Sequence, residues 1–143
     1  MMRKKEIGPV EILPEEPLLL SIISKGGISL YTHIFSKEWE NKLMFSSFMD
    51  AFNSFSHEFF SKTLDRVKIG ENTIIMTPFE NKILCYVIKG QTYPAQQKLN
   101  KFSEEIQNSK EILDALNSSF STGAVLNEEN SPVLGELVNT IFV

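Results

Sequence analysis

Cysteine is nearly absent from the sequence, with Cys85 alone among 143 residues. A single cysteine excludes an internal disulfide bond and a zinc site built from several thiolates, and it fits a reduced, cytosolic setting. Long apolar runs are missing too, since none approaches the ~20 residues that a membrane-spanning helix needs. The N-terminal MMRKKEIGPV also lacks the apolar stretch of a signal peptide. We therefore expect a cytoplasmic protein that is at most peripheral to a membrane.

Basic residues do not predominate. The chain carries 14 Lys and Arg against 18 Asp and Glu, which gives a formal net charge of −4. General nucleic-acid binders need a basic face that displaces counterions from the phosphates. We therefore expect no nucleic-acid partner.

Motifs for catalysis and cofactor binding are also lacking. The sequence has no Walker, GxGxxG or HExxH spacing. Gly26-Gly27 precedes an apolar run with the pattern of a strand, so we interpret the pair as a hairpin turn and not as a phosphate cradle at a helix N-terminus. The acidic residues Glu38, Glu40 and Asp50 do not form a metal cluster. We expect no cofactor, no metal and no catalytic residues, in a protein that is not an enzyme.

Phenylalanine, by contrast, is abundant. The chain has eleven Phe against three Tyr and one Trp, and a Phe ring has no polar tip that needs a hydrogen-bond partner. This composition indicates dry packing surfaces. The length predicts one domain, large enough to bury roughly 68–70% of the surface that its unfolded chain exposes.

Short apolar runs separated by turn residues predict five strands. The run LLLSIIS is nearly continuously apolar, as in a strand covered on both faces. Gly26 and Gly27 then supply the turn, and an alternating strand follows. Three further runs are separated by Gly-Glu-Asn and Glu-Asn-Lys, which favours a meander. The five predicted strands cover residues 18–24, 28–35, 65–71, 72–80 and 82–90.

Helical spacing follows the first hairpin and returns after the last strand. Five apolar residues at spacings of four, four, three and four form one stripe: Met44, Phe48, Phe52, Phe55 and Phe59. A helix of about 20 residues through them would be about 30 Å long. Further apolar stripes predict helices that begin near Pro94, at 110–120 and after Ser131-Pro132.

These elements predict an α/β (α+β) fold. The most apolar strands belong in the centre and the strand with Arg66 and Lys68 at an edge, which gives the order 2-1-5-4-3 for a five-stranded antiparallel sheet. The Phe-striped helix would cross one face, two later helices would cover the other, and an extra C-terminal helix would follow. We divide the chain into an N-terminal arm (1–17), the domain itself (18–120), and a loop with a C-terminal helix that packs on it (121–143).

The hairpin ISKGGISLY, the long crossover helix, the meander ending in CYVIKG and the helix after it resemble a longin domain. The opening is similar to longin subunits of vesicle-tethering complexes and to the N-terminal domain of the signal recognition particle receptor α subunit. The resemblance covers about residues 18–120 and extends to small archaeal longin-like proteins. The related roadblock fold has a similar sheet, but usually begins with a helix before the first hairpin.

The resemblance implies a non-enzymatic adaptor. Longin domains dimerise, bind small GTPases or hold trafficking components together, so we expect a protein partner and a homo- or heterodimer. Because no SNARE heptad segment or apolar anchor follows, we expect a stand-alone subunit. Partners would be recognised through a sheet edge or the adjacent helix, and the candidate interface residues are Phe45, Met49, Arg66 and Lys68.

Two alternatives remain open at this point. One is a roadblock-type GTPase regulator. The other is a small ligand-binding or thiol-dependent enzyme domain, with a pocket near Cys85, His33 and Tyr93. A catalytic cysteine needs a histidine in contact with it, whereas a cysteine in the middle of the apolar run ILCYVI is by default a buried, inert thiol.

Overall fold

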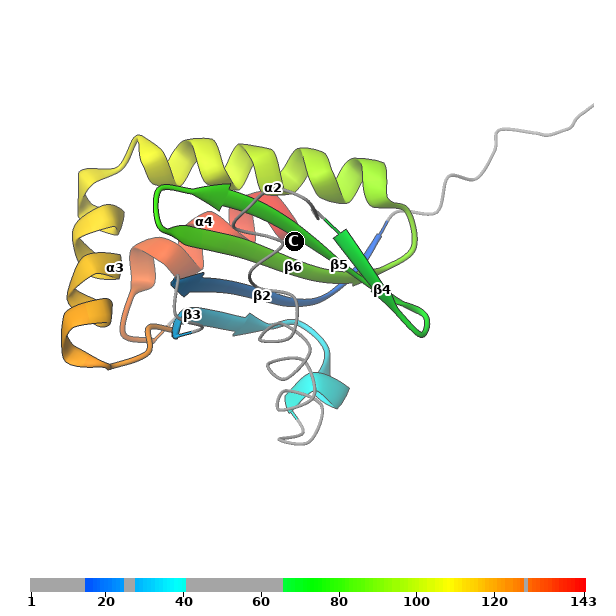
Figure 1. Cartoon of the computed structure of the whole chain (residues 1–143), viewed down its shortest axis with the longest axis horizontal. Coiled ribbons are helices and arrows are strands. Elements are labelled where there is room, and N and C mark those ends of the chain that lie inside the picture. Colours follow the sequence, from blue (N-terminus) through cyan, green and yellow to red (C-terminus); the bar gives the residue numbers. More distant parts are fainter. Residues whose placement is uncertain (1–14, 25–27, 41–65, 128) are drawn as a thin grey trace, which may run out of the picture.

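The computed structural model describes residues 15–24, 28–40, 66–127 and 129–143 (Figure 1). The predicted turn at Gly26 and Gly27, and the predicted Phe-striped helix with Phe45 and Met49, lie outside these ranges. The described elements, in chain order, are β2 (Glu16–Ser24), β3 (Ser29–Ile34), the 3-10 helix η1 (Lys37–Glu40), β4 (Arg66–Ile69), β5 (Asn72–Phe79), β6 (Lys82–Lys89), α2 (Thr92–Gln107), α3 (Lys110–Thr122) and α4 (Pro132–Phe142).

The strands form one sheet in the order β3-β2-β6-β5-β4, and all neighbouring strands are antiparallel. This arrangement confirms the predicted order 2-1-5-4-3. The three most apolar strands, β2, β6 and β5, lie inside the sheet, as expected because strands that are buried on both faces are apolar at nearly every position. The alternating strand β3 and the polar strand β4 lie at the edges.

Two-residue turns join the last three strands. The turn residues are Gly70-Glu71 between β4 and β5, and Glu80-Asn81 between β5 and β6. Gly70 has a φ of +63°, a conformation that glycine adopts without steric penalty. Pro78 lies near the end of β5, beyond Ile75, the last residue of this strand that pairs with β4. Its missing N–H therefore removes no bond to β4, as the position of a proline in a sheet requires.

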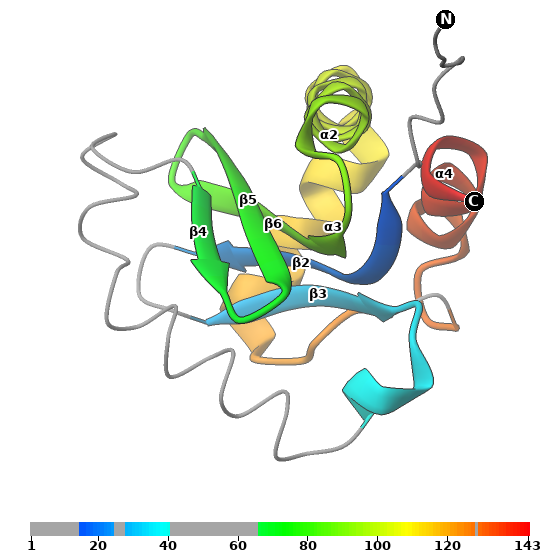
Figure 2. The ribbon, with the colours of Figure 1, turned by 90° about the vertical axis from the view of Figure 1, so that its right-hand side faces the viewer.

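The three described α-helices share one face of the sheet. Figure 2 shows α2 above the strands and α4 to its right, beside β2, and α3 continues from α2 toward the edge at β3. The apolar side chains of α4 lie in the same core as those of the sheet and α2. This first core cluster comprises Leu20, Ile22, Leu30, Tyr31, Ile75, Phe79, Leu84, Tyr86, Ile88, Ala95, Leu99, Phe102, Ile106, Ile112, Leu116, Leu134, Val138 and Phe142.

The opposite face of the central strands is buried as well. A second core cluster contains Leu18, Leu19, Ile23, Trp39, Ile74, Met76, Ile83, Cys85 and Val87. The nearly continuous apolar character of β2 and β6 thus has a direct structural reason, because each strand contributes to both clusters. The helix predicted to cross this face falls in a part of the chain that the structure does not describe.

Candidate protein-interaction surface

The edge strand β4 carries the two predicted interface residues that the structure describes. The side chains of Arg66 and Lys68 are exposed, whereas Val67 between them packs against the second core cluster. The Arg66 Nη1 donates a hydrogen bond to Thr92 Oγ1 at 3.3 Å, where α2 begins. Two cationic side chains therefore lie along this edge on the side of α2.

The other edge strand, β3, is partly covered by the chain itself. Residues 124–127, which we call the strap, run beside it after α3 ends, and Leu126 forms a parallel bridge with Tyr31 (Figure 1). The Leu126 N–H donates to Leu30 O at 2.8 Å, and the Thr32 N–H donates to Leu126 O at 3.3 Å. The strap thus saturates part of an edge that sequence reasoning had left open to a partner.

Side chains hold the strap at both of its ends. The Ser119 hydroxyl on α3 is buried, 3.2 Å from Leu30 O and 2.6 Å from Ala124 O. At the other end, the Asn127 N–H donates to Asn130 Oδ1 at 2.7 Å, and Asn130 Nδ2 donates to Val125 O at 3.2 Å. The sequence predicted only a loop here, because a single parallel bridge is made by backbone atoms and leaves no periodic side-chain signal.

Apolar side chains are exposed around the strap. The exposed fractions are 47% for Ile28, 52% for Phe120 and 46% for Val125. Each lies close in sequence to a residue that bonds across this edge: Ile28 to Leu30, Phe120 to Ser119, and Val125 to Leu126. The β3 edge is therefore bordered by apolar surface, unlike the cationic β4 edge.

A buried carboxylate joins the start of β2 to β6 and α2. The Glu15 side chain is fully buried, and its Oε2 accepts a hydrogen bond from Tyr86 Oη at 3.0 Å and lies 2.7 Å from Lys98 Nζ. Its Oε1 has no hydrogen-bond partner among the described residues. Burial, followed by the nearby Glu15 charge, raises the pKa of Tyr86, so the phenol stays protonated and donates. The three residues form a polar clamp inside an apolar core.

The residues of the thiol-enzyme alternative are not brought together. Cys85 belongs to the second core cluster, on the face opposite α2. The His33 ring contacts the Phe35 ring at a tilt, with ring centroids 4.5 Å apart, and Phe35 packs against the first core cluster. Tyr93 is exposed on α2, where its hydroxyl accepts from Gln97 Nε2. A Cys–His pair of the kind that activates a thiolate therefore does not form from these residues.

Cys85 is expected to be inert toward thiol reagents in the folded protein. Its side chain is fully buried, and burial raises the pKa of the thiol, so almost no thiolate is present at neutral pH. Absorbance after adding Ellman's reagent should show no release of thionitrobenzoate in native buffer and one equivalent in denaturant. Rapid labelling of the native protein would instead revive the thiol-enzyme alternative.

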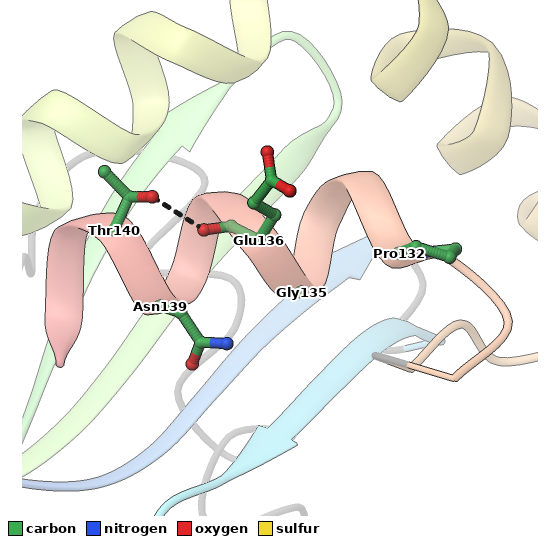
Figure 3. Close-up of a pocket in the computed structure, with 5 residues that line it drawn as sticks. All are labelled: Pro132, Gly135, Glu136, Asn139 and Thr140. Atoms are coloured by element: carbon green, nitrogen blue, oxygen red, sulfur yellow. Dashed lines mark hydrogen bonds between the residues drawn. The ribbon is translucent and has the colours of Figure 1, made fainter.

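A shallow depression on the described surface is lined by few side chains that could bind a ligand or catalyse a reaction. It measures about 440 Å³ and lies on α4, beside Pro132, Gly135, Glu136, Asn139 and Thr140 (Figure 3). The Thr140 hydroxyl there donates to the Glu136 backbone oxygen of its own helix at 2.9 Å.

Within the described ranges, no three His, Cys, Asp or Glu side chains could hold a metal ion. No helix in them is long and apolar enough to cross a lipid bilayer.

Comparison with known proteins adds no relative to this description. No family model, curated protein or solved structure matches the chain. The assignment of function therefore depends on the fold and on the chemistry of its two sheet edges.

Proposed function

We propose that this chain is a longin-like, non-enzymatic interaction module that acts as an adaptor in small-GTPase regulation or membrane-trafficking-type assemblies. The observation that carries the proposal is the five-stranded antiparallel sheet in the order β3-β2-β6-β5-β4, with the helices α2, α3 and α4 on one of its faces. One fold can serve several functions. The chemistry of the surface must therefore distinguish between the functions that this fold can serve.

The surface chemistry favours binding over catalysis. The buried carboxylate of Glu15 is engaged in internal contacts with Tyr86 and Lys98. The buried thiol of Cys85 has a raised pKa and lies away from His33. The β4 edge presents the exposed cations Arg66 and Lys68, and sheet edges are where extended segments of partner proteins commonly dock.

Affinity capture from a native lysate tests the proposal. The tagged full chain is used as bait, and bound proteins are identified by mass spectrometry. Recovery of a small GTPase, or of a second longin-type or roadblock-type subunit, would support the adaptor function. If neither class is enriched over a tag-only control, the proposal fails.

Charge reversal at the β4 edge tests whether Arg66 and Lys68 take part. A variant with Arg66→Glu and Lys68→Glu is expected to bind the captured partner at least ~10-fold more weakly. A partner surface that is complementary to the two cations would be acidic, and the introduced carboxylates would repel it. The matched control reverses Lys101 and Lys110, which are exposed on α2 and α3 and give the same change in net charge. Equal affinities of the two variants, measured by surface plasmon resonance, would remove the β4 edge from the interface.

A further inference from the structure

The strap resembles a bound peptide more than an ordinary loop. Its backbone is paired with β3 through Leu126, using one outward-facing acceptor, Leu30 O, and one outward-facing donor, Thr32 N–H. The Leu126 side chain is partly buried and packs against the first core cluster. A backbone ladder combined with an anchoring side chain is how added strands are recognised at sheet edges.

The strap covers only a small part of the outer edge of β3. Its pairing with β3 consists of a single bridge and two backbone hydrogen bonds. Ala124, Val125 and Asn127 are exposed around Leu126. The neighbouring side chains of Ile28 and Phe120 remain about half exposed, so apolar surface continues beyond the area that the strap covers. A longer extended segment could use this surface, whereas the strap does not.

We propose that the outer edge of β3 is a strand-docking site, that the strap occupies it in cis, and that an extended segment of a partner protein replaces the strap. The partner segment runs parallel to β3, pairs with Leu30 O and Thr32 N–H, and places an apolar side chain where Leu126 lies. This inference rests on the proposed adaptor function, for which it names the site and the chemical class of partner.

The occupant must be extended because of the groups that it replaces. Removing the strap leaves the Thr32 N–H without its partner and leaves Leu30 O with only the Ser119 hydroxyl, and buried backbone groups are nearly always paired. A helix has no free donor and acceptor along its length to offer, whereas an extended strand offers both. The anchoring residue must be uncharged because Leu126 contacts an apolar core cluster.

The test uses the strap itself as the probe. A fluorescein-labelled peptide, STGAVLN, reproduces residues 121–127, and its binding is followed by fluorescence anisotropy. The protein variant is Leu126→Pro, which removes the N–H that bonds Leu30 O and so frees the edge. We expect this variant to bind the peptide at least ~10-fold more tightly than the wild type, in which the tethered strap competes at a high effective concentration.

Two controls separate docking from nonspecific adhesion. The peptide STGAVDN replaces the anchoring leucine by aspartate and is expected not to bind the Leu126→Pro variant. The protein variant Val125→Ser keeps both ladder bonds and is expected to behave as the wild type. If circular dichroism shows that Leu126→Pro does not fold, Ser119→Ala takes its place, because it loosens the strap by removing the hydroxyl between Leu30 O and Ala124 O.

Three results would overturn the inference. They are equal binding of STGAVLN by the strap variant and the wild type, equal binding of STGAVLN and STGAVDN, and dimerisation of the strap variant that excess peptide reverses. The last result would assign the edge to a second copy of the chain. The lysate capture is independent of these outcomes, so an adaptor that uses another surface would still be recognised when the peptide fails.

Discussion

Replacing Phe142 by alanine is expected to lower the free energy of unfolding by about 3–5 kcal/mol, the range found for large aromatic-to-alanine changes in packed interiors. The Phe142 ring is buried and contacts three aromatic rings among the described residues, with centroid distances of 4.7 Å to Tyr86, 5.4 Å to Phe102 and 6.2 Å to Phe35. It is the point at which α4 is fixed to β6 and α2. Urea denaturation followed by circular dichroism measures the change.

The adjacent residue offers a matched control. Val143 is 84% exposed, so Val143→Ala is expected to change the unfolding free energy by less than ~0.5 kcal/mol, as surface substitutions do. A loss below ~1 kcal/mol for Phe142→Ala would contradict the described packing. It would mean that α4 does not rest on the sheet of its own chain in solution.

The second large effect concerns the buried clamp. Replacing Lys98 by methionine is expected to cost about 2–4 kcal/mol, because it leaves the fully buried carboxylate of Glu15 without its counter-charge. Methionine retains the apolar stem that Lys98 lays along the protein, so the change isolates the charge. The expected loss is below the upper range for buried ion pairs because the Lys98 side chain is 34% exposed.

Another lysine on the same helix provides the comparison. Lys101 lies 3.7 Å from Glu105 in an exposed pair, and Lys101→Met is expected to change stability by only about 0.3–0.5 kcal/mol. Adding Glu15→Gln to Lys98→Met removes the stranded charge and should recover part of the lost stability. Equal losses for the two lysine variants in urea denaturation at pH 7 would contradict the clamp.

The hydrophobic pattern of the sequence predicted the strands and their order correctly, because the composition of a strand depends directly on how many of its faces are buried. The run LLLSIIS is apolar at both odd and even positions, and β2 indeed contributes Leu20 and Ile22 to one core cluster and Leu19 and Ile23 to the other. The alternating strand β3 and the charged strand β4 lie at the edges for the same reason. The predicted boundaries differ by up to two residues, as at β2, which begins at Glu16 and not at residue 18.

The candidate site was only partly accessible to such reasoning. Arg66 and Lys68 were found because charged residues on a short strand mark an edge. The clamp was missed because Glu15 and Tyr86 are 71 residues apart in sequence, and no local pattern distinguishes a buried glutamate from an exposed one. The thiol alternative paired Cys85 with His33, but side-chain alternation and strand order place them on different faces of the sheet.

Hydrophobic periodicity was enough to predict the number and type of the described strands, their order in the sheet and which of them are central, because it encodes how many faces of an element are buried. The groups that meet across the fold became visible in the three-dimensional structure alone: the strap on the edge of β3, the clamp at Glu15, and the aromatic contacts of Phe142. These depend on backbone atoms and on residues far apart in the chain. Their proximity is set by how the helices cross the sheet, which a one-dimensional pattern does not record.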